Sequence, residues 1–371
     1  MGRVGMDLSP LTRARTGVGH YTHRLIEHLL AAGGASYLGF AAGRGAIEPG
    51  LESKLAGLRR VPLPIRVLYA SWSWTGRPRV DRLLGGVDVF HATNYFLPPV
   101  HKSKRVVTIH DLAFLKHPEW CSPKIRGTFS RNIGRFAREA DALLTVSQAA
   151  KEDVVELLGV PEERITVTHN AVDGGLARVS RDDVASVLER YGVRQPYVLF
   201  VSTLEPRKNV EGLLEAFAAL LDDFPHTLVL VGQWGWGAEP ILAALERPAL
   251  RGRVHRVGYV ARHADLGAFY SGADAFFFPS FYEGFGIPVL EAMTCGAPVV
   301  TSDRSALPEV AGDAARYVDP DDVEAMAAGL RAVLEDTALR ERLREAGFAR
   351  ARKFSWADCA ARTYAVYRGL V

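Results

Sequence analysis

The sequence predicts an α/β protein built from two doubly wound parallel sheets. Short runs of β-branched and other apolar residues alternate with longer amphipathic stretches, which is typical of parallel sheets covered by helices on both faces. The alternation occurs in two successive series, with a break in the pattern near 173–196. The 371 residues, 48% of them hydrophobic, are enough for two cores of ordinary size and exclude extensive disorder.

The elements follow in order along each series. In the first series the apolar runs predict strands at 3–8, 36–42, 87–92, 105–111, 142–147 and 165–170, with amphipathic helices at 19–33 and 147–159. In the second series they predict strands at 197–202, 227–232, 254–260, 275–280, 298–302 and 315–319, with helices at 209–224 and 288–295. We therefore expect one Rossmann-like domain at 1–180 and a second at 190–352. A terminal helix at 353–371 could cross back to the first domain.

Composition limits the class of protein. No apolar stretch of about 18 residues or more suggests a membrane span, and the first ten residues lack the apolar core of a secretory signal. The three cysteines, Cys121, Cys295 and Cys359, are widely spaced and form no CxxC pair, so neither a disulfide framework nor a zinc site is expected. A net charge of +3 is too small to indicate nucleic-acid binding. We expect a cytoplasmic protein.

One region, 53–80, is strongly basic. It contains Lys54, Arg59, Arg60, Arg66, Arg77 and Arg79, no acidic residue, and the interleaved aromatic residues Tyr69, Trp72 and Trp74. Basic side chains beside Trp and Tyr suit an anionic membrane surface or an acceptor loop. A solvated edge with a few packed aromatic residues explains the same pattern, and the sequence leaves both interpretations open.

A glycine pair opens the first predicted helix. Gly17 and Gly19 would let backbone amides approach a phosphate at the positive end of that helix, although an ordinary glycine turn has the same appearance. The dinucleotide fingerprint GxGxxG fails, because Thr22 stands where its third glycine belongs. A NAD-dependent enzyme is therefore disfavoured.

Charged and titratable residues follow two predicted strands. His110, at the end of 105–111, could donate a hydrogen bond to a sugar hydroxyl or to a developing charge, and Asp111 could fix its tautomer or contact the substrate. A structural His–Asp pair is the alternative. Arg207 and Lys208 begin a predicted helix, where the helix dipole disfavours cations. An anionic ligand such as a phosphate explains this pair better than a solvated surface does.

The most distinctive segment is 278–320. Glu283 follows a strand, Gly284 and Gly286 permit tight turns, and a helix begins near Pro288. The amino end of that helix suits a diphosphate. Carboxylates repel phosphates, so Glu283 and Glu291 are expected to face hydroxyls, with Glu291 accepting from a ribose and Glu283 reaching a transferred sugar.

These motifs resemble a known family. EGFGIPVLE at 283–291 matches the E-x7-E motif of retaining GT-B glycosyltransferases of family 4, and the surrounding 280–302 resembles that family almost residue by residue. TGVGHY, TIHDLAFLKHPEW, TVSQAAKEDVVELLGVPEERITVTHNAVD and STLEPRKN resemble its mannosyltransferase-like branch. The resemblance implies a GT-B fold, in which two Rossmann-like domains face each other across a cleft. It also implies that the domain at 1–180 binds the acceptor and the domain at 190–352 binds the nucleotide sugar.

The resemblance also implies roles for individual residues. Glu291 would hold the donor ribose, and Arg207 and Lys208 would bind the diphosphate, with the Gly17–Gly19 loop closing over it. The donor sugar would be contacted by His110, Glu283, Gly284 and the backbone of Phe285, Gly286 and Ile287, while Val260 would help to wall the base. The sequence departs from the family at Ser202 and Thr203, where many members carry a glycine and an arginine, and at the unusual loop Gln233-Trp234-Gly235-Trp236.

The implied reaction is transfer of a hexose from a nucleotide-diphosphate sugar to a glycan or lipid-linked acceptor, with the anomeric configuration retained. GDP-mannose is the favoured donor, on the branch resemblance alone, and a front-face route is favoured over a double displacement. No cofactor and no metal are expected, because the only D-x-D, Asp319-Pro320-Asp321, is typical of a turn. A nucleotide-sugar epimerase or hydrolase of similar fold, and a non-catalytic sugar-nucleotide binding protein, remain as alternatives.

Overall fold

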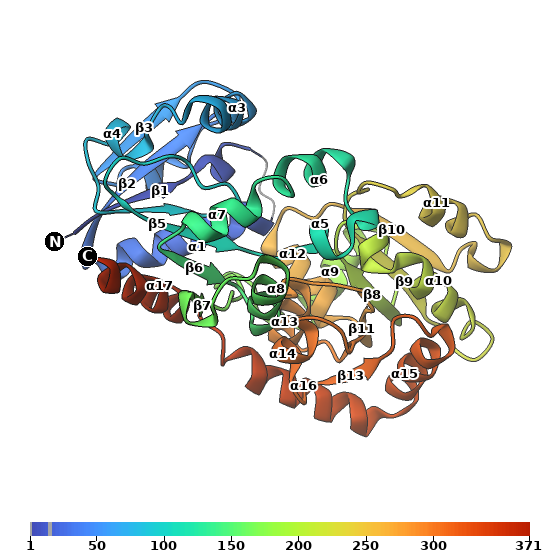
Figure 1. The fold of residues 1–371 in the computed structure, drawn as a ribbon. Coiled ribbons are helices and arrows are strands. Elements are labelled where there is room, and N and C mark those ends of the chain that lie inside the picture. Colours follow the sequence, from blue (N-terminus) through green and yellow to red (C-terminus); the bar gives the residue numbers. More distant parts are fainter. Residues whose placement is uncertain (1, 14–16) are drawn as a thin grey trace. The chain divides into compact units, whose positions relative to one another are not determined.

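The computed structural model describes residues 2–13 and 17–371, which form two compact units. The first unit comprises Met1–Lys116, Pro123–Asn170 and Ser355–Val371, and the second comprises His117–Ser122 and Ala171–Phe354 (Figure 1). Each unit therefore contains a segment that lies far along the chain from the rest of it.

The first unit is built on a parallel sheet of seven strands among the described residues, in the order β3-β2-β1-β4-β5-β6-β7. The strands are β1 (Gly2–Asp7), β2 (Ala35–Ala42), β3 (Gly57–Val61), β4 (Val89–Ala92), β5 (Lys104–Ile109), β6 (Ala142–Thr145) and β7 (Ile165–Val167). The central strand β4 is buried along its whole length and β5 over its last four residues, which is typical of parallel strands covered on both faces.

Helices cover this sheet and one comes from the far end of the chain. They are α1 (Gly17–Ala32), α2 (Pro49–Glu52), α3 (Ile65–Thr75), α4 (Val80–Leu83), α5 (Ala113–Lys116), α6 (Pro123–Phe129), α7 (Ile133–Glu139), α8 (Gln148–Leu158) and α17 (Trp356–Leu370), with a 3-10 turn at Ser9–Thr12 and another at Glu162–Arg164. The helix α17 packs against α1, where Trp356 contacts the rings of His20 and Tyr21.

The second unit repeats the plan with a six-stranded parallel sheet in the order β10-β9-β8-β11-β12-β13. Its strands are β8 (Tyr197–Val201), β9 (Thr227–Val231), β10 (Val254–Gly258), β11 (Ala275–Phe278), β12 (Val299–Ser302) and β13 (Ala315–Val318). Its helices are α9 (Arg181–Arg190), α10 (Val210–Ala218), α11 (Glu239–Leu245), α12 (His263–Ser271), α13 (Ile287–Cys295), α14 (Leu307–Ala311), α15 (Val323–Glu335) and α16 (Thr337–Ala351), with 3-10 turns at Pro118–Trp120, Pro206–Lys208 and Pro248–Leu250.

Every strand expected from the sequence is present, and one was missed. The strand β3 is the edge strand of its sheet; its sequence GLRRV is basic and largely exposed, so it lacks the apolar run that marks the buried strands. The helix expected over 209–224 is also shorter than predicted, because α10 ends at Ala218 and turns follow up to Phe224.

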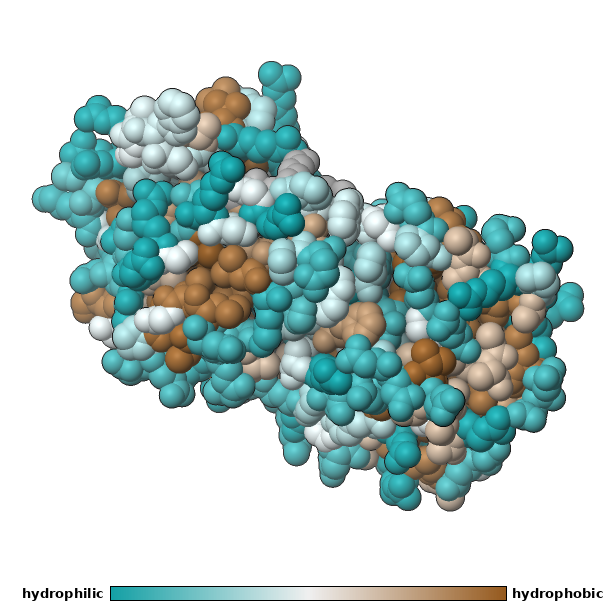
Figure 2. Space-filling model, turned by 45° about the vertical axis from the view of Figure 1, so that its right-hand side comes forward, coloured by the Kyte–Doolittle hydropathy of each residue, from teal (hydrophilic) through white to brown (hydrophobic). Residues whose placement is uncertain are grey.

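The outer surface is mainly hydrophilic on the face that Figure 2 presents, with hydrophobic side chains gathered in limited patches. In the described part of the chain, we find no helix that combines the length and the apolar character needed to cross a bilayer.

Candidate active site

The frame of the candidate site is the connection from β11 to α13. Gly286 has a φ of 104° and caps the helix, which begins at Ile287 with Pro288 in its first turn. A side chain at Gly286 would also approach Leu307 to 2.7 Å, so glycine is required there twice over. The helix ends at Gly296, with a φ of 81°, as the sequence predicted.

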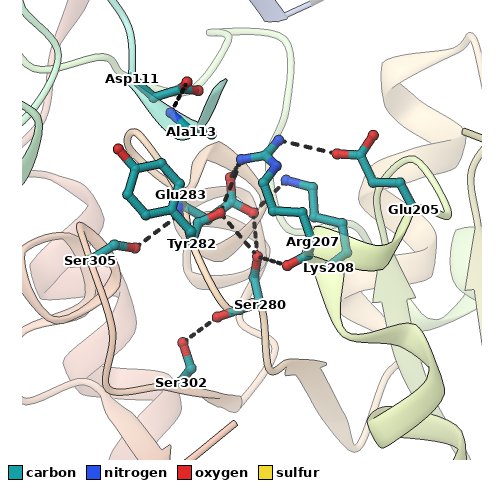
Figure 3. Close-up of polar contacts among 10 residues, drawn as sticks. All are labelled: Asp111, Ala113, Glu205, Arg207, Lys208, Ser280, Tyr282, Glu283, Ser302 and Ser305. Atoms are coloured by element: carbon teal, nitrogen blue, oxygen red, sulfur yellow. Dashed lines mark hydrogen bonds and ion pairs between the residues drawn. The ribbon is translucent and has the colours of Figure 1, made fainter. Parts of the chain in front are cut away.

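Three predicted residues meet in front of this helix (Figure 3). The Lys208 ammonium contacts Oε1 of Glu283 directly, and Nη1 of Arg207 lies 3.3 Å from Oε2. Nη2 of Arg207 is also 3.2 Å from a carboxylate oxygen of Glu205. Lys208 and Glu283 are both buried, with exposed fractions of 6% and 7%. The two cations, expected to await an anionic ligand, thus already have carboxylate partners within the chain.

Serine hydroxyls that the sequence did not single out hold this carboxylate in place. Ser280 donates to Oε1 of Glu283 at 2.9 Å, and Ser302 donates to the backbone oxygen of Ser280 at 2.6 Å. The backbone amide of Glu283 donates to Oγ of Ser305 at 2.8 Å. Ser305 has a φ of 52°, a left-handed conformation that costs about 1 kcal/mol or more for a residue other than glycine. The contact with the Glu283 amide therefore comes from a residue in an unfavourable backbone conformation.

Burial and charge decide the ionisation of the cluster. Burial alone would raise the pKa of Glu283, but Lys208 and Arg207 outweigh it and hold this pKa below its ordinary value. Burial, together with Arg207, lowers the pKa of Lys208, while Glu283 opposes the shift. With Arg207 and Glu205 included, two cations face two anions, so the cluster carries almost no net charge.

The second acid of the motif lies apart from this cluster. Glu291 is one turn into α13 and partly exposed, and Oε2 accepts a hydrogen bond from the Tyr270 hydroxyl at 2.9 Å. Burial raises the pKa of Glu291 to about 7, although the bond from Tyr270 acts in the opposite direction. Sequence reasoning missed Tyr270, since only the packing of α12 on α13 brings these positions together.

The remaining predicted residues of the second unit lie where their strands and helix place them. Val260 is buried just after β10, and its neighbour Tyr259 is 63% exposed. Gly284 and Phe285 are buried in the loop, and the ring of Phe285 meets the edge of Phe354, with centroids 5.7 Å apart. In the unusual loop after β9, the Arg256 guanidinium lies 4.8 Å from the ring centre of Trp234.

An aromatic stack supports the Glu283 loop from a distant part of the chain. His117 stacks on Trp120 at 4.0 Å, and Trp120 stacks on Phe281 at 5.3 Å between ring centres. His117 also lies 5.7 Å from the ring of Tyr282. These contacts place His117–Ser122 in the second unit. The segment lies within TIHDLAFLKHPEW, but no spacing rule indicated which sheet it would join.

His110 follows β5 in the first unit and is buried. Its Nε2 is 2.9 Å from the backbone oxygen of Thr93, so Nε2 carries the proton and Nδ1 is an acceptor. The expected tautomer-fixing role of Asp111 is wrong, because that carboxylate accepts from the backbone amide of Ala113 at 3.1 Å instead. Burial lowers the pKa of His110, although the Thr93 bond and Asp111 oppose this.

His110 rests on a buried hydrogen-bonded chain. The Tyr21 ring packs edge-on against it, with centres 4.7 Å apart, and the Tyr21 hydroxyl is 2.9 Å from Oγ1 of Thr108. Thr108 contacts His91 at 2.8 Å, and His91 contacts the Tyr367 hydroxyl at 2.6 Å. The chain therefore runs from the terminal helix α17 to the ring beneath His110.

The glycine pair and the D-x-D sequence complete the predicted positions. Gly17 begins α1 and Gly19 is buried in it, whereas residues 14–16 of the preceding loop lie outside the described residues. Asp319 pairs with Arg304 at 2.7 Å and accepts from the backbone amide of Asp321, which is the geometry of a turn. Within residues 2–13 and 17–371, no group of three or more His, Cys, Asp or Glu side chains is arranged to hold a metal ion.

Comparison with known proteins assigns both halves of the chain. Residues 189–350 match the family described as glycosyl transferases group 1, and residues 15–174 match glycosyltransferase family 4. The O-antigen chain mannosyltransferase B of Escherichia coli is 35% identical over 381 aligned residues, which cover 97% of each chain.

Solved structures agree on the fold. The sucrose-phosphate synthase of Thermosynechococcus elongatus has a TM-score of 0.79 at 22% identity and covers 100% of this chain and 99% of its own. Anabaena HepE, solved with UDP and glucose, has a TM-score of 0.74 at 21% identity, with 99% of each chain covered. Two doubly wound parallel sheets, the family matches and the near-full-length relative agree: this chain belongs to the group 1 glycosyltransferases of family 4, has the GT-B fold, and is a glycosyltransferase.

Proposed function

We propose that this enzyme transfers mannose from GDP-mannose to a growing or lipid-linked glycan, with retention of the anomeric configuration and without a metal ion. One observation carries the site assignment: Lys208 and Arg207 converge on Glu283 beside the amino end of α13. Cations for the diphosphate and a carboxylate for the sugar hydroxyls, placed together at the positive end of a helix, are what a nucleotide-diphosphate sugar needs.

The cations would act on the leaving group. When the bond from the sugar C1 to the diphosphate oxygen breaks, negative charge develops on the diphosphate, and Lys208 and Arg207 would stabilise it. The acceptor hydroxyl oxygen bonds to C1 on the same face, and its proton passes to a diphosphate oxygen. Glu283 would then contact the transferred sugar, because the diphosphate takes over its cation partners.

The rest of the donor would lie along α13 and the end of β10. Glu291 would accept hydrogen bonds from the ribose hydroxyls, and Val260 would pack against the base. The turn Phe285-Gly286-Ile287 would contact the sugar. His110 would contact the sugar as well. Since its Nδ1 is an acceptor, we propose that it accepts a hydrogen bond from a sugar hydroxyl rather than donating one.

The choice of mannose is supported by the relative of almost equal length, an O-antigen chain mannosyltransferase. A solved relative of the same fold binds UDP, so the donor base must be tested directly. Purified enzyme should be incubated with GDP-mannose, UDP-glucose and UDP-galactose, with and without a mannan oligosaccharide, in EDTA. We expect acceptor-dependent GDP release from GDP-mannose alone, and an α-linked product by proton NMR.

Controls separate the competing outcomes of this assay. Lys208→Ala and Glu291→Ala should each lose the thermal shift given by GDP, whereas Lys353→Ala, an exposed lysine, should keep it. Loss of activity in EDTA that Mg²⁺ restores would refute the metal-free part. Donor consumption that does not depend on the acceptor would indicate the hydrolase or epimerase instead. Intact GDP shifts in both variants would show that the donor site is wrong.

We also propose that the enzyme is cytoplasmic and that α3 docks it on an anionic membrane surface. Val67, Ala70 and Trp74 lie on one side of α3, and Val67 and Trp74 are 49% and 89% exposed. Leu63 just before the helix is 44% exposed, while Ile65, Leu68 and Trp72 face the core. Exposed Arg66 and Arg77 flank the apolar side, a pattern that suits the boundary between lipid headgroups and acyl chains.

The structure sharpens the choice of variants for this docking surface. Arg60 pairs with Glu52 at 2.6 Å, so its charge is already partly compensated, and Arg66 is the better residue to neutralise. Flotation should use vesicles of phosphatidylglycerol with phosphatidylcholine. We expect salt-sensitive binding that Trp74→Ser and Arg66→Gln each weaken. Binding that is absent, or unchanged in both variants, would remove the membrane proposal.

A further inference from the structure

Tyr270 is a buried tyrosine whose hydroxyl meets the site only through Glu291. It lies near the end of α12, is 0% exposed, and donates to Oε2 of Glu291 at 2.9 Å. Its ring meets the edge of Phe276, with centres 5.4 Å apart, so packing as well as the hydrogen bond fixes its position. Nothing in the reaction as described above uses this hydroxyl.

The two oxygens of Glu291 are not equivalent. Oε2 is taken by Tyr270, while Oε1 accepts no hydrogen bond from any residue that the structure describes. A carboxylate at the surface of a helix has several rotatable bonds, and binding a ligand would normally require ordering them. A fixed hydroxyl on one oxygen removes that cost and presents the other oxygen in a defined direction.

We propose that Tyr270 is a positioning residue for the donor: its hydroxyl holds Oε2 of Glu291 so that Oε1 is presented to the ribose hydroxyls of the nucleotide. This inference rests on the proposed ribose-binding role of Glu291. Tyr270 itself touches neither the nucleotide nor the reacting atoms, and acts through the carboxylate alone.

The proposed role of Tyr270 should also appear in the pH dependence of nucleotide binding, because Tyr270 affects the ionisation of Glu291. The titratable groups that face it are the phenol of Tyr270 on α12 and the thiol of Cys295 further along α13. Of the other helices packed on α13, α14 carries Glu309, and α16 brings Arg344, which donates to the backbone oxygen of Gly296 at 2.8 Å. Burial raises the pKa of Glu291 to about 7, and the Tyr270 bond keeps it from rising further.

The sign of the pH effect follows. Only the ionised carboxylate accepts from both ribose hydroxyls, so nucleotide affinity should fall as the pH drops through about 7. Removing the Tyr270 hydroxyl takes away a bond that favours the ionised form. The midpoint of this fall should therefore move to higher pH in Tyr270→Phe.

The test measures binding, and needs no acceptor. The affinities of GDP and 2′,3′-dideoxy-GDP, with UDP and 2′,3′-dideoxy-UDP in parallel, are measured by calorimetry from pH 6 to 8.5. For the nucleotide that binds, Tyr270→Phe should lower the affinity of the ribonucleotide about tenfold at pH 7 and leave the dideoxy form nearly unchanged. The control Tyr197→Phe also removes a buried hydroxyl, one that donates to the Phe269 backbone on α12, and should match the wild type.

The outcomes distinguish this inference from the proposal on which it rests. If Glu291→Gln binds the ribonucleotide in preference to the dideoxy form as strongly as the wild type does, Glu291 does not bind the ribose. If Glu291→Gln abolishes the preference but Tyr270→Phe keeps both the preference and the pH midpoint, only the role of Tyr270 is overturned. Should Tyr270→Phe not fold, Glu291→Asp withdraws the carboxylate from the phenol while keeping its charge. It should give the same loss, and wild-type affinity in that variant would overturn the role of Tyr270.

Discussion

Two residues that follow strands of the second unit are oppositely charged and paired with each other, whereas two residues that follow strands of the first unit form a hydrogen bond between neutral groups. Lys208 follows β8 and meets Glu283, which follows β11. Thr93 follows β4 and accepts a hydrogen bond from His110, which follows β5. Both units have the same doubly wound parallel plan, with their central strands in the interior of the sheet.

The difference shows that the plan of the sheet does not decide the chemistry at its edge. Burial lowers the pKa of His110, and His91 behind it has a pKa of about 3, so both rings are uncharged at neutral pH. In the second unit, the effect of burial on the pKa of Glu283 is outweighed by the positive charges of Lys208 and Arg207. In the function proposed above, the charged pair of the second unit would meet a diphosphate, and His110 of the first unit would meet a sugar hydroxyl.

The largest expected effect comes from removing a cation of the second unit. Lys208→Ala takes away a charge aimed at the leaving diphosphate, so kcat/KM should fall about 100- to 1000-fold. Steady-state kinetics with the best donor measure this. Because Glu283 would be left with Arg207 alone, Tm should fall too, and Lys208→Ala/Glu283→Gln should recover Tm without activity. A Lys208→Ala enzyme with wild-type kinetics would contradict the charge-based view of this edge.

Glu283→Gln separates binding from turnover in the same cluster. Without the Glu283 carboxylate, Lys208 loses its ion-pair partner while Arg207 keeps Glu205, so the cluster becomes more positive and the nucleoside diphosphate should bind a few-fold more tightly. Turnover should fall about 100-fold, because the contact with the transferred sugar is lost. Calorimetry and kcat measure the two effects, with Glu215→Gln, an exposed acid on α10, as control. Weaker nucleotide binding would be the contrary result.

A smaller loss is expected in the first unit. His110→Asn should lower kcat about tenfold, as one neutral hydrogen bond is lost, with nucleotide affinity unchanged. Since the pKa of His110 lies below its ordinary value, its protonation should not limit the wild-type rate at mildly acidic pH. Rate profiles over pH compare the variant with His101→Asn, an exposed histidine. A rate limb near pH 6.5 that disappears in His110→Asn would show a charged ring instead.

The smallest change concerns the aromatic stack. Trp120→Ala should loosen the loop that carries Glu283 and lower kcat a few-fold, with only a modest loss of Tm. Trp74→Ala, which removes an 89% exposed ring, should leave both unchanged in a detergent-free assay without membranes. Equal effects of the two substitutions would show that the stack does not order the loop.

Much of this architecture follows from local sequence. Apolar runs predict the buried strands, and Gly286, Pro288 and Gly296 predict the limits of the helix 287–295. Local sequence does not predict contacts between segments that are far apart along the chain. Neither the basic edge strand β3 nor the hydroxyl of Tyr270 beside Glu291 leaves a periodic signal. The prediction that Asp111 fixes the tautomer of His110 was wrong for the same reason. The hydrogen-bond partner of His110 is Thr93, which lies far from it in the sequence.

The return of α17 to the first unit has a consequence for biosynthesis. Translation makes this helix only after all of the second unit, yet Trp356 packs on α1 and Tyr367 completes the buried chain through His91 and Thr108. During translation, the surface of α1 that α17 covers therefore stays exposed until the second unit and α17 have been synthesised. A chaperone that shields α1 during this interval would be expected to raise the yield of active enzyme.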